Sequence, residues 1–410
     1  MYKLTVIFSS LVFFIACGEL DKPQNEIVAG GEIVVNVNGA TIKKSLIDKK
    51  TSGIDENTTV YGYKAYKIPY VTKDEEGNSI KVSGLFVIPT GVPDVMKSSG
   101  FSMVSDSHGT IFANEEAPSV IAQTQNAPDG SAVILTSLFG FATLQADYIG
   151  FGDSSSHYHP FILKKSLANA SIDFIKAVKS FALDNSINLN GQLFLTGYSE
   201  GGYTAMATLE QIEKEGELSV TLTAPMAGPY ALEAMAMGVL NNPTLSVPSF
   251  MANVGYSYAK AFDEDIASVI SEPYASKLEG LFDGSHLRQA IDSELSTETS
   301  TLFEQSFITQ TLTDPNFWFR QALVANSVHA WIPSTAVRLV HCEGDDVIPY
   351  AISQLTLGTM QTMGVKNIDL VPVESTLGLP IKVGHSDCGA LAYTISATMF
   401  ADTRKASVGY

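Results

Sequence analysis

The sequence predicts an α/β fold with a mostly parallel central sheet, because strand-like and helix-like segments alternate over most of its 410 residues. Helical patterns, such as those at 163–183 and 350–363, separate most of the strand candidates. The strand candidates are short apolar segments at 101–105, 141–146, 192–197, 219–224, 336–341 and 368–373. Alternation of this kind is typical of a parallel sheet that is covered by helices on both faces.

Two segments depart from this alternation. The segment 59–89 alternates apolar and polar residues on both sides of a Glu-Glu-Gly-Asn turn, which predicts an N-terminal antiparallel hairpin. A second segment, of roughly 100 residues, separates the strand that ends near Pro225 from the strand at 336–341, far beyond the usual short crossover. Because its patterns are helical, we expect an inserted helical cap at about 230–333.

Composition and charge exclude several classes of protein. Hydrophobic residues make up 45% of the chain and aromatic residues 10%, which is typical of a globular protein. The net charge of −18 repels phosphate backbones and no cluster of Lys and Arg offsets it, so we expect no nucleic-acid partner. His157 and His159 have no third ligand nearby in the sequence, so we expect loop residues there and no metal site.

The segment MYKLTVIFSSLVFFIACGE has the pattern of an export signal. Basic Lys3 precedes an apolar run, Leu4 to Ile15, that is too short to span a bilayer as a mature helix. The ending Phe-Ile-Ala-Cys resembles a bacterial lipobox, in which cleavage precedes the cysteine and a lipid is attached to it. This resemblance implies a lipid on Cys17, although the motif usually has Leu where Phe14 stands. An ordinary cleaved signal and a retained anchor are the alternatives.

These features predict the organisation and the location of the protein. We expect a signal peptide at 1–16, the lipidated Cys17 and a polar tether at 17–57, and a folded domain at 58–410. The protein is expected to be exported and held in a membrane by its lipid anchor. The expected place is the bacterial outer membrane or cell surface, with a periplasmic or secreted protein as the alternative.

The segment LFLTGYSEGGY at 193–203 places Ser199 in a Gly-x-Ser-x-Gly pattern. The apolar run before it predicts a buried strand, and the residues from Tyr203 favour a helix, so Ser199 falls on a strand-to-helix turn. Glycine allows the chain to bend tightly there, and the helix N-terminus favours negative charge that develops over the serine. The pattern therefore predicts a nucleophile, which requires an acid and a histidine from later strands.

The required partners follow Ser199 in the expected order. Asp345, in VRLVHCEGDDVIPY, comes after an apolar strand candidate and a short turn. His385, in KVGHSDCGALAY, follows the next strand candidate and precedes a helix. We expect Ser199, Asp345 and His385 to form a catalytic triad with His385 as the general base. Ser386 lies in a similar Gly-His-Ser segment, but no histidine follows it, so it cannot form a triad in this order.

The segments Gly-Tyr-Ser-Glu-Gly, HCEGDDVIPY and ADYIGFGDS together resemble the α/β-hydrolase superfamily, from about Thr58 to the C-terminus. The long helical insertion resembles the cap of the secretory, lipase A-like lipases within it. In these proteins the acid stands four residues before the proline of an Asp-x-x-x-Pro turn, which corresponds to Asp345 and Pro349 and leaves Asp346 as a solvated neighbour. The resemblance implies an α/β-hydrolase fold and a serine esterase or lipase.

The expected activity is hydrolysis of small-molecule or lipid carboxylic esters through an acyl-enzyme on Ser199, with no cofactor or metal. A serine peptidase or an acyltransferase can use the same triad. Prolyl-oligopeptidase-like peptidases resemble this domain, but they generally carry a large β-propeller, for which the chain has no room. A non-catalytic binding protein on this fold is a further alternative, and the retention of all three catalytic residue types argues against it.

Two backbone N–H groups are expected to bind the oxyanion that forms during the reaction. One belongs to Glu200, which follows the nucleophile directly. The other comes from FSMVSDSHGTIF, where His108 and Gly109 follow a strand candidate. By resemblance to hydrolases with His-Gly at this position, the N–H of Thr110 faces the nucleophile. The alternative is that His108 and Gly109 only form a tight turn.

With Cys17 lipidated, Cys342 and Cys388 remain of the 3 cysteines. An even pair in an exported protein favours a disulfide. Cys342 lies three residues before Asp345 and Cys388 three residues after His385, so a triad brings the two cysteines close together. The alternative is that both are free and buried as small apolar side chains.

Overall fold

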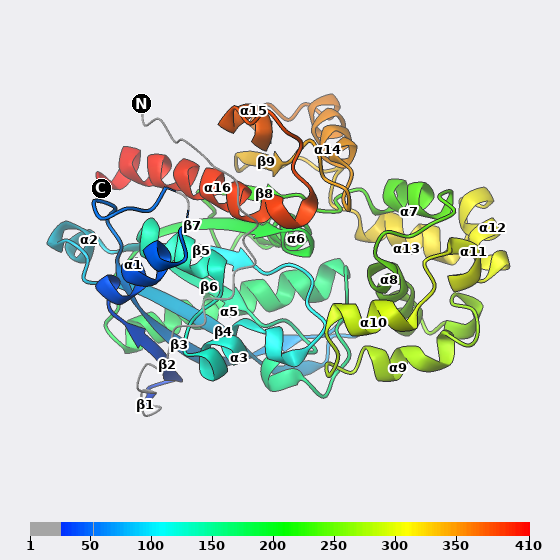
Figure 1. Cartoon of the computed structure of the whole chain (residues 1–410), viewed down its shortest axis with the longest axis horizontal. Helices are drawn as coiled ribbons and strands as arrows, with labels where there is room; N and C mark the ends of the chain where they lie inside the picture. Colours follow the sequence, from blue (N-terminus) through cyan, green and yellow to red (C-terminus); the bar gives the residue numbers. More distant parts are fainter. Residues whose placement is uncertain (1–25, 52) are drawn as a thin grey trace.

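The computed structural model describes residues 26–51 and 53–410, so the expected signal peptide and Cys17 lie outside the described residues. The described residues form one sheet of 10 strands in the order β1-β2-β3-β4-β6-β5-β7-β8-β9-β10 (Figure 1). The strands are β1 Glu26–Val28, β2 Gly31–Val37, β3 Gly62–Lys73, β4 Ser79–Thr90, β5 Phe101–Ser107, β6 Ala142–Ala146, β7 Leu189–Tyr198, β8 Leu222–Met226, β9 Val337–His341 and β10 Ile368–Pro372.

The strand directions confirm the expected α/β architecture. Strands β5 to β10 pair in parallel with one another, whereas β1 to β4 form antiparallel pairs and β4 joins β6 antiparallel. The expected hairpin is β3 and β4, whose register pairs Gly62 with Thr90 and Lys73 with Ser79. Each expected parallel strand is present, and the ends differ by a few residues.

The expected polar tether at 17–57 is wrong for residues 26–48. These residues form β1, β2 and helix α1 (Gly39–Asp48), and β2 pairs antiparallel with β3. The physical reason is that apolar side chains of β2 and α1 pack against the hairpin of β3 and β4. Val35 in β2 and Ile42 and Leu46 in α1 are buried in one cluster with residues of β3 and β4.

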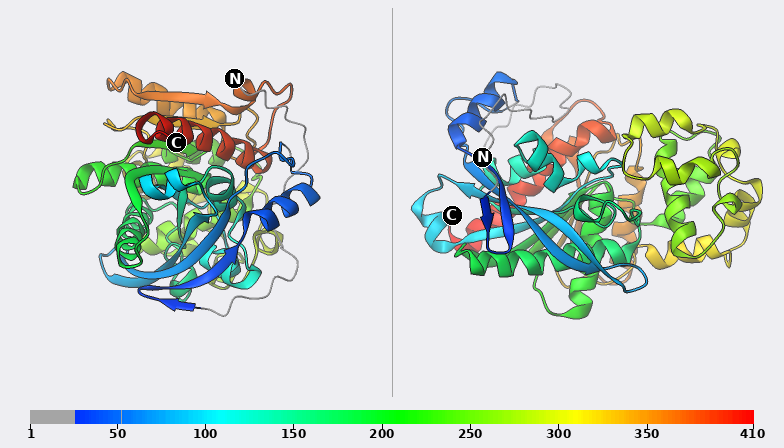
Figure 2. Two further views of the ribbon diagram at one scale, coloured as in Figure 1. Left: turned by 90° about the vertical axis from the view of Figure 1, so that its left-hand side faces the viewer. Right: turned by 90° about the horizontal axis from the view of Figure 1, so that it is seen from below.

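Helices cover both faces of the sheet, as the edge-on view in Figure 2 shows. One face carries α5 (Lys164–Asp184), α6 (Glu200–Glu215) and α14 (Tyr350–Thr362). The other carries α1, α3 (Pro118–Gln125), the π-helical turn η2 (Val133–Leu138) and α16 (His385–Val408). The smaller helices around the sheet are α2 Asp94–Ser99, α4 Gly130–Ala132 and α15 Val373–Leu377.

Aromatic side chains fill both interfaces between helices and sheet. On the α5 face, the rings of Tyr70 and Phe174 lie 5.1 Å apart. On the α16 face, the ring centroid of Phe400 lies 4.7 Å from that of Phe194 and 6.3 Å from that of Phe141. Large buried rings of this kind contribute much of the hydrophobic stabilisation of a core.

The chain between β8 and β9 forms a group of helices at one end of the sheet, on the right in Figure 1. These helices are α7 Leu232–Leu240, α8 Pro248–Ala261, α9 Leu278–Leu281, α10 Arg288–Glu294, α11 Thr299–Leu302, α12 Gln305–Thr313 and α13 Trp318–Asn326. Both tryptophans of the chain, Trp318 and Trp331, lie in this segment. Within residues 26–51 and 53–410, no helix has the length and apolarity that a membrane span requires.

Candidate active site

Ser199 lies on the sharp turn between β7 and α6, with backbone angles φ 59° and ψ −120°. Such a conformation costs a residue other than glycine on the order of 1–3 kcal/mol. The N–H of Ser199 holds the turn by donating to the carbonyl oxygen of Met226 in β8 at 2.9 Å. Glycine is required at Gly201, because a Cβ there would lie 1.9 Å from the carbonyl oxygen of Ser107. The turn thus projects the serine side chain from the end of the strand.

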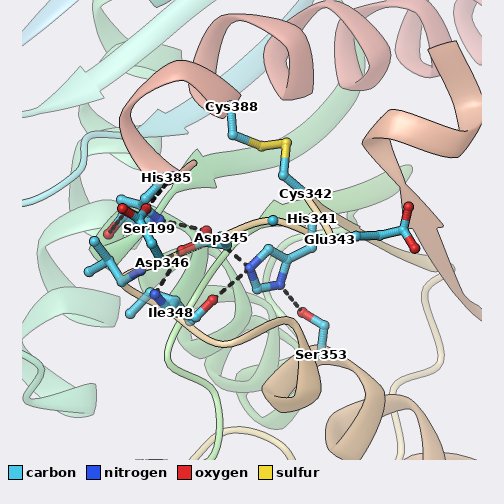
Figure 3. A network of polar contacts seen from close by, with 12 residues as sticks. Ser199, His341, Cys342, Glu343, Asp345, Asp346, Ile348, Ser353, His385 and Cys388 are labelled. Carbon is cyan, nitrogen blue, oxygen red and sulfur yellow. Dashed lines mark hydrogen bonds and ion pairs between the residues drawn. A yellow bond between two sulfur atoms is a disulfide. The ribbon is translucent and has the colours of Figure 1, made fainter. Parts of the chain in front are cut away.

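Ser199, His385 and Asp345 lie in one hydrogen-bonded row (Figure 3). Nε2 of His385 is 2.9 Å from Oγ of Ser199, and Nδ1 of His385 is 2.7 Å from Oδ2 of Asp345. His385 begins α16, and Asp345 lies in the turn after β9. The side chains of His385 and Asp345 are 10% and 0% exposed. The structure therefore brings together the three residues for which the sequence predicts a triad.

The carboxylate of Asp345 is surrounded by donors. Its Oδ1 accepts from the N–H groups of Val347 and Ile348 at 3.0 and 2.8 Å, and its Oδ2 lies 3.1 Å from Nε2 of His341. Burial alone would raise the pKa of Asp345, but the hydrogen bonds from His341 and His385 hold that pKa below its usual range. Asp345 is therefore a fixed negative charge behind the imidazole of His385.

His341 is a residue of this site that the sequence analysis does not assign. It ends β9, is fully buried, and places Nδ1 2.8 Å from Oγ of Ser353 in α14 (Figure 3). Because Nε2 faces Asp345 and the carbonyl oxygen of Ile348, this nitrogen carries a hydrogen and donates. The signal in the sequence is one polar residue at the end of an apolar strand, four residues before Asp345.

Asp346, expected as a solvated neighbour, has an exposed side chain and a structural contact. Its Oδ1 accepts from the N–H of His385 at 2.9 Å. Asp346 thus holds the backbone of His385, whereas Asp345 holds the imidazole. Ser386, the second serine that the sequence analysis considers, is exposed and lies outside the hydrogen-bonded row.

The loop of His108, Gly109 and Thr110 lies against the turn of Ser199. A Cβ on Gly109 would lie 3.1 Å from the carbonyl oxygen of Tyr198 and 3.8 Å from Cβ of Ser199. Thr110, Ser199 and Glu200 line the same cavity. The two segments expected to donate backbone N–H groups to an oxyanion are therefore adjacent. As the first residue of α6, Glu200 has no intrahelical acceptor for its own N–H.

A cavity of about 650 Å³ extends from Ser199 into the helices between β8 and β9. Thr110, Ser199 and Glu200 line it, and Asn242, Thr244 and Ser246 add further polar groups from the segment between β8 and β9. Many of the other lining residues are apolar and come from α7, α8, α12 and α13, among them Met235, Val239, Phe250, Phe307 and Phe319. A ligand whose carbonyl carbon lies at Ser199 would therefore have an apolar environment for the rest of its structure.

Two further connections tie the turn of Asp345 to the segment of His385. Cys342 and Cys388 are joined by a disulfide, with a Cα–Cα distance of 6.1 Å (Figure 3). Buried Glu374 provides the second connection, because it accepts from the N–H groups of Glu343, Gly344 and Val383 at 2.7, 3.0 and 3.0 Å. Burial alone would raise the pKa of Glu374, but these backbone hydrogen bonds lower it.

The two histidines of the His-x-His segment have different surroundings. His157 is exposed, whereas His159 is buried with Nε2 2.8 Å from Oε1 of Glu200. The described part of the chain has no group of three or more His, Cys, Asp or Glu side chains that could hold a metal ion. The contact between His159 and Glu200 joins a loop to the residue after Ser199, which no local sequence pattern indicates.

Comparisons with known proteins agree with this architecture. The prolyl oligopeptidase family matches residues 130–215, and no curated protein matches the chain. An inferred hydrolase from Legionella pneumophila has a TM-score of 0.82 at 22% identity, covering 93% of this chain and 99% of its own. The rice cell wall degrading esterase LipA from Xanthomonas oryzae has a TM-score of 0.76 at 23% identity, and the match covers 94% of this chain and 99% of the esterase. Candida antarctica lipase A has a TM-score of 0.58 at 16% identity, and the match covers 86% of this chain and 76% of the lipase. The chain thus has the α/β-hydrolase fold.

Proposed function

We propose that the protein is a serine carboxylic ester hydrolase, an esterase or lipase, that acts through an acyl-enzyme on Ser199. The observation that carries this proposal is the row of Ser199 Oγ, His385 Nε2, His385 Nδ1 and Asp345 Oδ2, with separations of 2.9 and 2.7 Å. His385 takes the proton of Ser199 as the hydroxyl attacks the ester carbonyl. It then returns this proton to the departing alcohol. Water, activated by the same imidazole, releases the acid.

The oxyanion of each tetrahedral intermediate is bound by the backbone N–H groups of Glu200 and Thr110. Both residues line the same cavity as Ser199, which supports this assignment. The positive end of α6 adds to the same stabilisation. Donors that are already oriented towards the developing charge lower the barrier more than donors that must rotate into place.

The helices between β8 and β9 act as a cap, at about 230–333, that encloses the apolar part of the substrate. The apolar residues that these helices contribute to the lining of the cavity support this role. Substrates are therefore small-molecule or lipid esters with an apolar acyl or alcohol group. The names of two structural neighbours, an esterase and a lipase, point to the same class of reaction.

A serine peptidase is the second candidate, and the match to the prolyl oligopeptidase family over residues 130–215 is the observation that favours it. The same triad would attack an amide instead of an ester. A panel of nitrophenyl esters from acetate to palmitate, tested beside a proline amide, separates the two candidates. Faster cleavage of the amide than of every ester would favour the peptidase.

We also propose that residues 1–16 are a signal peptide, that Cys17 carries a lipid, and that the protein is exported. The lipobox-like sequence supports the first two points. The disulfide between Cys342 and Cys388 supports export, because disulfides persist in oxidising compartments. These assignments place the folded domain at a membrane surface.

The experiment that tests the proposed activity is Ser199→Ala. This variant should remain folded and lose ester hydrolysis, because only the nucleophile is removed. A fluorophosphonate probe should label the wild-type protein at Ser199 and should not label the variant. The matched control is Ser386→Ala, which changes an exposed serine next to His385 and should retain labelling. Labelling at a serine other than Ser199 would contradict the assignment.

A further inference from the structure

The side chain of Glu200 is buried directly after the proposed nucleophile, with 1% of its surface exposed. Its Oε1 lies 2.8 Å from Nε2 of His159, whose side chain is 8% exposed. The other carboxyl oxygen, Oε2, is buried and has no hydrogen-bond partner within the described residues. A lone negative charge in this position would be strongly unfavourable. The charge state of the His159–Glu200 pair therefore matters both for stability and for the adjacent Ser199.

The contacts of His159 fix the number of protons in the pair. Nδ1 of His159 lies 2.9 Å from the carbonyl oxygen of Ile149, and Nε2 faces Glu200. A carbonyl oxygen and an ionised carboxylate only accept, whereas neutral imidazole has a hydrogen on one nitrogen only. Neutral His159 beside ionised Glu200 would leave one of these contacts without a hydrogen. One additional proton satisfies both contacts, whether it resides on His159 or on the carboxyl group of Glu200.

We propose that His159 and Glu200 share one proton as an electrically neutral pair, and that His159 thereby prevents a net negative charge beside the oxyanion that forms at Ser199. The inference rests on the proposed function, in which the N–H of Glu200 binds that oxyanion. Glu200 and Ser199 line one cavity, and charges interact strongly in such a buried environment. An unpaired carboxylate here would oppose the negative charge of the transition state.

The other groups around Glu200 do not supply this proton. The hydroxyl of Tyr148 donates to the carbonyl oxygen of His108 and that of Tyr203 to the carbonyl oxygen of Asn326, and burial raises the pKa of both tyrosines well above the ordinary value. His108 stacks on Tyr148 with ring centroids 4.0 Å apart. Within the described residues, the ion pair of Glu200 is with His159. The positive N-terminal end of α6 favours a carboxylate nearby. A charged Glu200 would, however, compete with the oxyanion for stabilisation by this helix end.

A double-mutant cycle measures this effect. His159→Asn keeps an amide donor for the carbonyl oxygen of Ile149 and cannot carry the extra proton. At alkaline pH, where an unpaired carboxyl group is ionised, we expect it to lower kcat at least about tenfold, with a smaller change in KM. In the Glu200→Gln background the charge is absent, so the same His159→Asn change should lower kcat by less than about threefold. The matched control is His157→Asn, which alters an exposed histidine of the same loop and should leave kcat unchanged.

Equal losses of kcat in the two backgrounds would show that His159 only supports the fold, and would overturn the proposal. A second measurement needs no variant and no substrate. In wild-type protein labelled with ¹⁵N in histidine and ¹³C in the glutamate side-chain carboxyl groups, NMR should show hydrogens on both ring nitrogens of His159, or one hydrogen on His159 together with the carboxyl shift of a protonated Glu200. Neutral His159 beside ionised Glu200 would also overturn the proposal. Residual hydrolysis by Ser199→Ala would instead reject the proposed function and leave this NMR result standing.

Discussion

The hydroxyl of Tyr198 donates to the carbonyl oxygen of His385 at 2.7 Å, and the two rings lie 4.9 Å apart. The residue before the proposed nucleophile therefore holds the backbone of the proposed base. Burial raises the pKa of Tyr198 well above its ordinary value, so the hydroxyl stays protonated and remains a donor. The turn of Ser199 and the start of α16 are thus joined by this contact and by the hydrogen bond between Ser199 and His385.

Tyr198→Phe should reduce kcat several-fold and leave KM nearly constant, because the ring is kept while one restraint on His385 is lost. The unfolding free energy should fall by about 0.5–1.5 kcal/mol, the usual contribution of one hydrogen bond. Steady-state kinetics and denaturant unfolding measure both effects. The control is Tyr203→Phe, which removes a buried hydroxyl that donates to Asn326 at 2.7 Å and should affect stability more than kcat. Complete inactivation by Tyr198→Phe would indicate a direct role in proton transfer.

Asp345→Asn should lower kcat on the order of 10⁴-fold, by analogy with triad acids, because the amide cannot stabilise the imidazolium of His385. Asp346→Asn should be mild in comparison, since an amide oxygen can still accept from the N–H of His385. Rates measured with one nitrophenyl ester compare the two variants directly. The assignment of the acid is wrong if Asp346→Asn is the more damaging change.

Ester hydrolysis should decline at acidic pH, because only neutral imidazole can take the proton of Ser199. Asp345 does not cause this decline. Burial would raise its pKa, but hydrogen bonds from His341 and His385 lower it, so Asp345 stays ionised throughout this range. Its contribution to stability is present above the ordinary aspartate pKa of about 3.9 and is lost only as the pH falls through the lower folded value. A flat profile of kcat/KM between about pH 5 and 8, with chemistry rate-limiting, would contradict the role of His385.

Removal of the disulfide should lower stability more than it lowers activity. Its sequence separation of 46 corresponds to at most about 4 kcal/mol in the entropic model. The folded Cys342→Ala/Cys388→Ala protein should retain activity, because Glu374 still connects the two segments. Denaturant unfolding with and without reductant measures the stability, and mass spectrometry of unreduced peptides detects the bond. Free, alkylatable thiols at both positions in exported protein would refute this prediction.

Cys17→Ser should release the protein from membranes, because the diacylglyceryl group proposed for Cys17 supplies the two chains that stable anchoring requires. The variant should keep its ester hydrolysis, since Cys17 is not one of the residues proposed to act on the ester. Fractionation followed by an alkaline wash is the measurement. Continued sedimentation of the variant with membranes would point to a different anchor.

The sequence predicted those parts of the fold that have a local pattern. The turn of Ser199 is one, because glycines, an apolar strand and a helix-forming segment are adjacent there. The chain order then pointed to Asp345 and His385. By contrast, the sequence shows His341 only as a polar residue at the end of an apolar strand. The roles of His341 and Glu374 become recognisable when β9, α14 and α15 come together, because their partners come from the next turn or from other elements.

The N-terminal strands show a different limit of sequence analysis. Residues 26–48 contain no aromatic residue, and the apolar side chains of β2 and α1 are buried only because the hairpin offers them a surface. The pair of His159 and Glu200 was missed for a related reason. It joins residues that are 41 positions apart, and neither type of side chain indicates its partner in the sequence.

The entry of residues 26–28 into the sheet has a mechanical consequence for an anchored protein. With a lipid on Cys17, the chain up to Glu26 can reach at most about 30 Å even when fully extended. The domain would then move within a thin layer above the bilayer surface, and its search for substrate would be nearly two-dimensional. Esters that partition into that layer would reach the cavity at a much higher effective concentration than esters in the bulk solution.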